Sequence, residues 1–265
     1  MNIENDYDLI EFYHRNTSMN DITIFKMQKQ INTALSNKKF QDYCYTPDNI
    51  YEKYSSNAIN LITCNLDQVK ETNIFNCLLD RRTNSTLPPH NTKLKFETFS
   101  QLLRYSFGVS NIENNHSKNC CYKYTFPTGG GLNTIEIFVI VNSVETIQPG
   151  IYLFNPYVNT ICPVIKKFSI EDYANITALT KQAANAFFTV YIVGNNKYSL
   201  TKYGARSYRF MNIEAGHCSQ NLYLVSTAFG LECAASGAFY DDNFFNLLSI
   251  PSENRFLLYE NFVGL

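Results

Sequence analysis

The chain has 265 residues, of which 45% are apolar and 15% aromatic. This is enough apolar side chain for a large core, so we expect one large domain or one domain with an appendage. Lysine and arginine number 22 against 23 aspartates and glutamates, and the formal net charge of −1 gives no electrostatic reason to expect nucleic acid or an anionic membrane as a partner.

The chain starts with an acidic segment that lacks the apolar core of a signal peptide. No run approaches the roughly 18–20 apolar residues that cross a bilayer. The 8 cysteines form no CxxC pair, and the 4 histidines form neither HxxxH nor HExxH. We therefore expect a cytoplasmic protein without a metal centre, in which most cysteines are small buried hydrophobic residues.

The first part of the chain carries the weakest pattern. Apolar residues with helical spacing predict a helix over 21–35, followed by irregular chain and a second helix over 66–80. We place a domain boundary near residue 75. Residues 1–75 are expected to form an N-terminal helical or irregular extension, ahead of one domain over 76–265.

Two arginines and two hydroxyls follow the second helix. The stretch Arg81–Ser85 (RRTNS) can clamp an anion through charge-assisted hydrogen bonds, although a solvated helix end is the more common use of such residues. Residues 96–107 then form an amphipathic pattern, which predicts a helix. Residues 111–125 are polar and indicate turns.

Three consecutive glycines stand near the middle of the chain, in Pro127–Asn133 (PTGGGLN). Such a segment lets the backbone approach a flat ligand and present its N–H groups, although many glycine segments are plain turns. Its spacing is neither that of a phosphate loop nor that of a dinucleotide fingerprint. The β-rich run that follows, 135–141, is typical of a central strand covered on both faces.

Strands and helices alternate in the second half. Further strands are expected over 151–154, 186–194 and 256–263, and helices over 169–178 and 242–248. Ser169 and Asp172 have the spacing of a capping box at the start of the first of these helices. This order around a mostly antiparallel or mixed sheet favours an α+β fold over a doubly wound α/β fold.

One long helix dominates the C-terminal third. From Met211 to Phe229 apolar residues recur at intervals of four and three, and Gly230 stands where a helix-ending glycine is expected. A second stripe widens the apolar face: Phe210, Ile213, Leu224 and Ala228. We therefore expect a helix that is buried on more than one side, in a core or across a subunit interface.

A group of polar residues lies just upstream of this helix: Lys202, Tyr203, Arg206, Tyr208 and Arg209. Their density is compatible with two interpretations, a polar pocket and a loop with ordinary surface charge. Within the helix, His217 is expected to be a partly buried histidine with a hydrogen-bond partner rather than a catalytic one.

Six stretches carry a resemblance in chain order: FYHRNT (12–17), RRT (81–83), PTGGGLNTIE (127–136), KYGARSYR (202–209), EAGHCSQNL (214–222) and GLECAASGAF (230–239). Together they resemble the FMN-dependent azoline dehydrogenases of ribosomal-peptide biosynthesis (the SagB/McbC type), a branch of the nitroreductase superfamily. The resemblance implies a nitroreductase-like fold, with a central sheet flanked by helices and FMN at a homodimer interface.

The resemblance also implies a set of cofactor-binding residues: Arg81, Thr83, Ser85, Thr128, Gly129, Gly130, Arg206, Arg209, Ser236, Gly237 and Ala238. The first two would hold the FMN phosphate, and the residues of the glycine segment would lie against the ring system or the ribityl chain. The last three would present N–H groups to the reactive edge of the flavin. Arg206 and Arg209 would either reach the phosphate from the partner subunit or brace their own loop.

In this family a lysine–tyrosine pair carries the protein's share of the chemistry, and Lys202 and Tyr203 occupy its place. The expected reaction oxidises a peptide thiazoline or oxazoline to the azole. A lysine can serve as the base only where desolvation or a neighbouring cation lowers its pKa. A cyclodehydratase complex and a precursor peptide would be the partners.

The chain also departs from the family pattern. Thr128 replaces a serine, Asn133–Thr134 replaces Tyr–Pro, and Ser85 stands where the superfamily has a second arginine. These changes either weaken FMN binding or reshape the pocket. Two alternatives therefore stay open: a flavin oxidoreductase of the same fold acting on a carrier-bound thiazoline, a nitro compound or a quinone, and a non-catalytic subunit of a biosynthetic complex.

Overall fold

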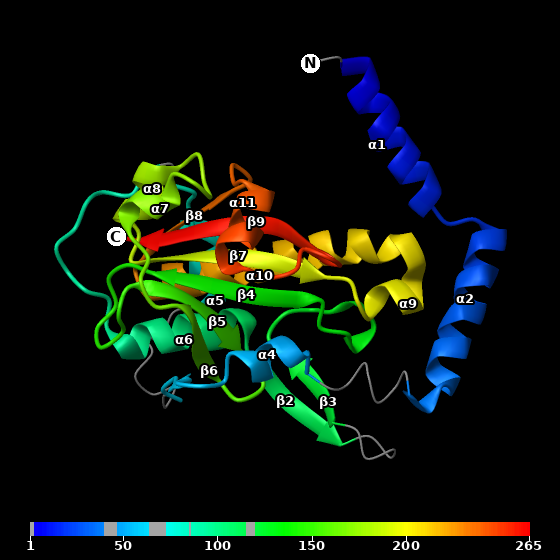
Figure 1. Cartoon of the computed structure of the whole chain (residues 1–265), viewed down its shortest axis with the longest axis horizontal. Coiled ribbons are helices and arrows are strands. Elements are labelled where there is room, and N and C mark those ends of the chain that lie inside the picture. The colour runs from blue at the N-terminus through cyan, green and yellow to red at the C-terminus, as the bar shows by residue number, and fades with distance from the viewer. Residues whose placement is uncertain (1–2, 40–46, 64–72, 85, 115–119) are drawn as a thin grey trace.

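A computed structural model of the chain describes residues 3–39, 47–63, 73–84, 86–114 and 120–265 (Figure 1). Its helices are α1 (Ile3–Thr17), α2 (Asp21–Ser36), α4 (Asn49–Lys53), α5 (Ile74–Asp80), α6 (Phe96–Phe107), α7 (Ile170–Tyr173), α8 (Thr180–Asn185), α9 (Ser199–Tyr203), α10 (Ser207–Ala228) and α11 (Asp241–Leu248). Two short 3₁₀ turns are η2 (Gly129–Gly131) and η3 (Gly204–Arg206). No helix in the described ranges combines the length and apolar character needed to cross a bilayer.

One antiparallel sheet organises the molecule. Its strands, in spatial order, are β1 (Ile59–Asn60), β6 (Thr160–Ile165), β5 (Gly150–Asn155), β4 (Ile135–Val141), β7 (Phe188–Asn195), β9 (Arg255–Gly264) and β8 (Glu232–Ser236). A separate hairpin consists of β2 (Val109–Asn114) and β3 (Cys120–Tyr124). The fold is therefore of the expected α+β class, with helices flanking a central sheet.

The sheet separates two hydrophobic cores. Along β4 every residue is buried, and the side chains alternate between the two faces because successive residues of a strand point to opposite sides. Val139 lies in the core that α6 and α10 cover, whereas Phe138 and Ile140 lie in the core under α7, α8 and α11. This confirms the expectation of a central strand covered on both faces.

Helix α10 is the longest helix and runs along one face of the sheet (Figure 1). It ends at Ala228, and Gly230 follows with a φ of 69°, as expected of a helix-ending glycine. Met211, Cys218 and Leu222 of the first stripe are fully buried. The second stripe is not buried within the chain, since Ile213 is 54% exposed. The expectation that this second stripe lies in a core is therefore wrong, and burial across a subunit interface stays a prediction.

Several expected elements coincide with observed ones. Helix α2 begins at the expected residue, α6 matches 96–107 and β4 matches 135–141. Ser169 and Asp172 form the expected capping box. The expectation of turns over 111–125 is wrong, because β2 and β3 pair there. The expected helix over 66–80 falls partly outside the described residues, and α5 occupies its end.

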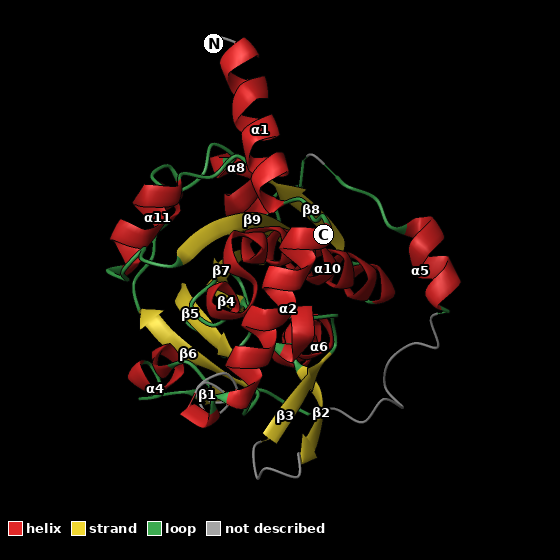
Figure 2. Cartoon of the chain, turned by 90° about the vertical axis from the view of Figure 1, so that its right-hand side faces the viewer, coloured by secondary structure: helices red, strands yellow, loops and turns green. Residues whose placement is uncertain are grey.

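The N-terminal part divides into two kinds of structure. Helix α2 lies beside α9 at one side of the body, and α1 projects away from the body in both views (Figures 1 and 2). Further on, β1 pairs with β6 at the edge of the main sheet, and Ile50 and Tyr51 of α4 are buried in the second core. The boundary near residue 75 stays a prediction.

Candidate functional site

The three-glycine segment forms a tight turn just before β4. Gly130 and Gly131 have φ angles of 65° and 75°, in the left-handed region that favours glycine. A Cβ at Gly130 would collide with Tyr203 Oη and lie 2.6 Å from Lys202 Nζ. The expected catalytic side chains therefore fill the space that the missing side chain of Gly130 leaves. Thr128 precedes the turn in extended backbone.

Lys202 is buried, with 8% of its surface exposed. Its Nζ donates a hydrogen bond of 3.3 Å to the carbonyl oxygen of Gly130 and lies 5.1 Å from the centre of the Tyr203 ring. None of the ion pairs among the described residues involves Lys202. The ring of Tyr203 packs edge-on against Phe210. An amine, a phenol and a backbone carbonyl thus meet at one point, where a proton can be held or moved.

Glu214 of α10 holds the other side of this turn. Its Oε1 accepts a hydrogen bond of 2.6 Å from the N–H of Gly129, and its Oε2 accepts one of 2.6 Å from the hydroxyl of Thr134. The side chain is almost completely buried, and burial raises the pKa of its carboxyl to about 7. We call Gly129–Gly131, Lys202, Tyr203 and Glu214 the glycine-turn cluster.

A second cluster gathers around Tyr223 of α10. Its phenol oxygen lies 3.0 Å from Thr83 Oγ1 and accepts a hydrogen bond of 2.8 Å from the N–H of Ala235. The Arg81 guanidinium lies over the same ring, 5.4 Å from its centre. We call Arg81, Thr83, Tyr223 and Ala235 the arginine–threonine cluster. Ser85 lies outside the described residues.

The segment Ser236–Ala238 continues from this second cluster. The Ala238 N–H donates to Ser236 Oγ over 2.9 Å, which shapes a turn at the end of β8. Behind it, Glu260 lies opposite Ser236 in the sheet and accepts a hydrogen bond of 3.0 Å from Thr177. Burial raises the pKa of Glu260 to about 7. Two expected cofactor-contacting segments thus each lie against a buried carboxyl.

The two clusters lie apart. Glu214 and Tyr223 are nine residues apart on α10, and at about 100° per residue their side chains leave the helix on opposite sides. The register of the strands also separates the two clusters. Strand β4 starts shortly after the glycine turn, whereas Thr83 pairs with Cys233, which lies level with the far end of β4. The 7 residues of β4 span roughly 20 Å. Within one chain the expected cofactor residues therefore form two half-sites.

The guanidinium groups of Arg206 and Arg209 hold the end of α1. Arg206 donates to the carbonyl of Thr17, and Arg209 donates to Thr17 Oγ1 over 2.7 Å and to the carbonyl of His14 over 3.0 Å. These cations bind the last turn of α1, where backbone carbonyls lack helical partners. These contacts hold α1 and not the arginines' own loop, and both expected roles, bracing that loop and binding the phosphate, stay predictions.

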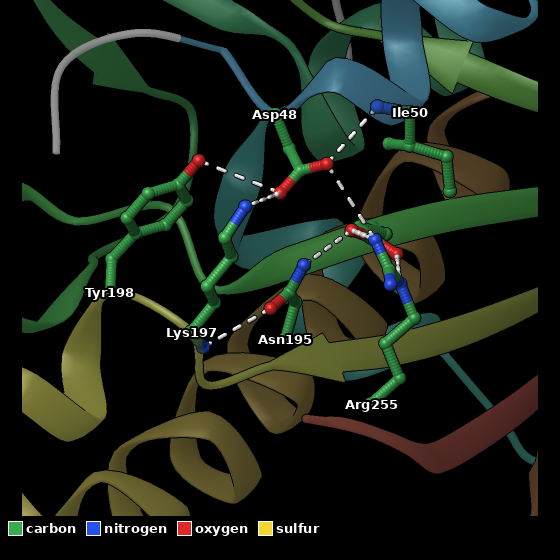
Figure 3. Close-up of polar contacts among 7 residues, drawn as sticks. Asp48, Ile50, Asn195, Lys197, Tyr198 and Arg255 are labelled. Atoms are coloured by element: carbon green, nitrogen blue, oxygen red, sulfur yellow. Dashed lines mark hydrogen bonds and ion pairs between the residues drawn. The ribbon is translucent and has the colours of Figure 1, made fainter. Parts of the chain in front are cut away.

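A polar cavity of about 30 Å³, room for about two water molecules, lies behind Gly131. At its wall Asp48 lies 3.6 Å from Lys197 and 3.7 Å from Arg255, and it caps α4 through the N–H of Ile50 (Figure 3). Arg255 also pairs with Glu136 over 2.8 Å. Two carboxylates thus meet two cations, and this balanced network ties the segment before α4 to three strands of the sheet.

The sequence patterns assigned no role to Glu214, the first residue of the EAGHCSQNL stretch, or to Tyr223, which directly follows that stretch. An acidic residue within an apolar stripe was the available signal for Glu214, because a buried carboxyl requires partners. Tyr223 gave no such signal. The expectation for His217 is wrong in one respect, since its buried Nδ1 has no hydrogen-bond partner in the described part of the chain.

Comparison with known proteins agrees with this architecture. The model of the nitroreductase family matches residues 80–261. A Methanocaldococcus jannaschii protein named as a nitroreductase is 27% identical over 185 residues, which are 70% of this chain and 88% of the relative.

Solved structures share the fold. A chain from Anabaena variabilis described as a nitroreductase superposes with a TM-score of 0.61 at 21% identity, over 78% of this chain and 41% of that one, so this chain spans less than half of its length. A chain of the Escherichia coli microcin synthetase McbBCD complex with truncated pro-MccB17 bound gives a TM-score of 0.57 at 19% identity, over 83% and 82%.

These structural likenesses, at such low identities, concern the fold alone. The family model, in contrast, covers more than half of the chain, from the arginine–threonine stretch to the last strand. The chain belongs to the nitroreductase family, whose fold serves flavin oxidoreductases.

Proposed function

We propose that this protein is an FMN-dependent dehydrogenase that oxidises peptide thiazolines or oxazolines to thiazoles or oxazoles in the biosynthesis of ribosomal peptide natural products. The observation that carries the proposal is the pair of buried Lys202 and half-buried Tyr203 against the glycine turn. The ordered motifs shared with the azoline dehydrogenases support it. The Escherichia coli neighbour supports a peptide substrate, because that structure is a microcin synthetase complex with truncated pro-MccB17 bound.

The glycine turn and the segment after β8 each leave space beside the backbone, which supports the proposal of a flat cofactor. A Cβ added at Gly131 or at Gly237 would meet no atom within 4 Å, so both segments are open to a flat ligand. Arg81 takes part in no ion pair among the described residues, which leaves its charge for a phosphate. Arg81 and Thr83 would hold that phosphate. When bound, FMN supplies the acceptor for the hydride that leaves the substrate ring.

The protein's own groups handle the proton. In the oxidation the azoline ring loses one proton and one hydride and gains a double bond. Lys202 takes the proton from the ring carbon, and the carbonyl of Gly130 fixes the direction of its amine. The phenol of Tyr203 lies beside that amine. It donates a hydrogen bond to a heteroatom of the azoline ring as the charge on that ring changes.

A homodimer completes the site in this proposal. One flavin cannot use both half-sites of a single chain that lie at opposite ends of β4. A two-fold axis would place the arginine–threonine cluster of one copy beside the glycine-turn cluster of the other. Exposed apolar residues supply surface for such contact on α10 and α5, namely Ile213, Phe75 and Leu79. A cyclodehydratase complex would supply the azoline from a precursor peptide.

The test is the loss of two hydrogen atoms from an azoline-bearing peptide incubated with the FMN-loaded protein, read by mass spectrometry. The double variant Lys202→Ala, Tyr203→Phe is expected to bind FMN and lose this activity. Lys197→Met is the matched control, because the amine of Lys197 pairs with Asp48 and has no place in the proposed proton transfer. Full activity of the double variant with flavin bound would contradict the catalytic assignment.

A second candidate is a nitro or quinone reductase that takes electrons from NAD(P)H. The name of the Methanocaldococcus jannaschii relative favours it. Rapid bleaching of the bound flavin by NAD(P)H alone, with no effect of the azoline peptide, would support this candidate. A protein that stays colourless after incubation with excess FMN would instead indicate a non-catalytic subunit.

A further inference from the structure

We infer that Glu214 is a positioning residue, which fixes the glycine turn and through it the amine of Lys202. Its two oxygens bind the two ends of the turn separately, the Gly129 N–H before it and the Thr134 hydroxyl after it, each over 2.6 Å. The consequence for catalysis rests on the proposed function, whereas the effect on the turn does not.

The turn needs an external support. Gly130 and Gly131 both have positive φ, and glycine has more backbone freedom to lose on ordering than any other residue. Their local sequence therefore does not fix one conformation. The carboxyl of Glu214 bridges the segment, and in the bridged conformation the Gly130 carbonyl faces Lys202 Nζ at 3.3 Å. A different turn would turn that carbonyl away from the amine.

Helix α10 supports both members of the catalytic pair from one face. Phe210 and Glu214 are one helical turn apart, so their side chains lie side by side. The ring of Phe210 packs against that of Tyr203, with 5.0 Å between ring centres. Glu214 supports the turn that holds Lys202. The helix thus sets the relative position of the amine and the phenol.

The choice of a carboxyl at this position has a cost. Glu214 is 2% exposed and takes part in no ion pair among the residues that the structure describes. Burying a carboxyl without a cation is unfavourable, and an apolar residue would pack against the sheet at less cost. What the carboxyl provides is two acceptor oxygens at fixed spacing, which match the two donors of the turn.

The direct test is hydrogen exchange of backbone amides, followed by NMR or by fragment mass spectrometry, on the full chain without substrate. In Glu214→Ala the amide of Gly129 loses its acceptor, and we expect its exchange to accelerate by about tenfold or more. Glu214→Gln keeps the shape and one acceptor oxygen, so it is expected to fall between Ala and the wild type. Ser219→Ala is the matched control, since Ser219 is buried on the same helix and donates to Asn261 over 2.5 Å.

Two outcomes would overturn the inference: unchanged exchange at Gly129 in Glu214→Ala, or an equal acceleration throughout the chain, which would indicate a general loss of stability. If Glu214→Ala does not fold, Glu214→Met decides alone, because it keeps the length of the side chain and offers no acceptor oxygen to the Gly129 N–H. Exchange at Gly129 faster than in the wild type supports the inference, and equal exchange contradicts it.

The kinetic arm separates this inference from the proposed function. With FMN loaded, Glu214→Ala is expected to lower kcat for azoline oxidation about tenfold or more while KM for the peptide stays within about twofold, because the group acts on the amine and not on the substrate. A change in KM alone would contradict the positioning role. If the wild type shows no azoline oxidation, the proposed function fails, and the exchange experiment still decides the role of Glu214 in the turn.

Discussion

Gly130 is the residue on which the expected catalytic side chains converge. A Cβ there would collide with Tyr203 Oη and lie 2.6 Å from Lys202 Nζ, on a backbone with positive φ. We predict that Gly130→Ala lowers kcat by about a hundredfold, because a displacement of about 1 Å has effects of that size.

Gly131→Ala is the control for this prediction. Gly131 also has a positive φ, so the backbone strain is similar, but its Cβ would meet no atom within 4 Å. The melting temperature of Gly131→Ala should fall about as far as that of Gly130→Ala. Gly131→Ala should nevertheless keep a larger fraction of the wild-type kcat. Equal kcat losses in the two variants would indicate that strain, and not the collision, causes the effect.

The buried carboxyl of Glu214 makes stability depend on pH. Burial raises its pKa from 4.5 to about 7, so the folded protein holds this proton more tightly than the unfolded chain. Its stabilising contribution is complete below pH 4.5 and is lost as the pH rises to about 7. The expected loss is about 3 kcal/mol.

Glu214→Gln isolates this contribution from those of all other groups. The variant cannot titrate at this position, so its free energy of unfolding relative to the wild type should rise by about 3 kcal/mol between pH 4.5 and 8. Urea denaturation at the two pH values measures this difference. A difference that does not change with pH would show that Glu214 titrates normally. Burial also raises the pKa of Glu260 to about 7. The free energy of unfolding of Glu260→Gln relative to the wild type should therefore change with pH in the same direction.

At the scale of elements, α10 connects pieces that are far apart in the sequence. Tyr223 accepts the N–H of Ala235 on β8 and contacts Thr83 beyond α5. We predict that Tyr223→Phe lowers the free energy of unfolding by about 1 kcal/mol, since the half-buried N–H of Ala235 loses its acceptor. Chemical denaturation measures this loss. Tyr208→Phe, at a more exposed tyrosine of the same helix, should change it by less than about 0.5 kcal/mol.

Helices and strands were easier to predict from the sequence where the burial of their side chains gave a clear apolar pattern. Residues 135–141 were predictable because a strand covered on both faces is apolar throughout. The hairpin of β2 and β3 was not, because it lies outside the main sheet and its Asn- and Lys-containing sequence leaves no clear alternation. Helix α1 was missed as well. Its residues Leu9, Ile10 and Phe12 are exposed, so no core imposes a helical stripe on them.

The candidate site was predictable as a set of stretches but not as an arrangement. The motifs singled out Lys202, Tyr203 and the glycine segment as separate stretches, and the structure brings the three together. The catalytic role of the two side chains stays a prediction. The bridge between Thr83 and Cys233 joins residues 150 positions apart, and no local pattern encodes such a pairing. For the same reason the separation into two half-sites was visible only once the register of the sheet was known.

At the scale of the whole molecule, the segment before residue 75 is partly built into the domain. Asp48 is buried beside Arg255 and Lys197, and β1 extends the sheet. We predict that a chain starting at residue 76 is less stable by about 3 kcal/mol or more, because it removes a buried partner of two cations. A chain starting at residue 47 keeps these contacts and should unfold close to the full-length protein. Equal stability of the two shortened chains would support an independent extension over 1–75.

The distance between the two half-sites has a genetic consequence. In a two-fold pair, a copy lacking Lys202 and a copy lacking Arg81 would each be silent alone, yet a mixed pair would hold one intact catalytic centre and one doubly defective centre. Co-refolding equal amounts of Lys202→Ala and Arg81→Ala chains should then restore about a quarter of wild-type turnover, since half of randomly formed pairs are mixed. Two inactive alleles of this gene would in that way complement each other within a single cell.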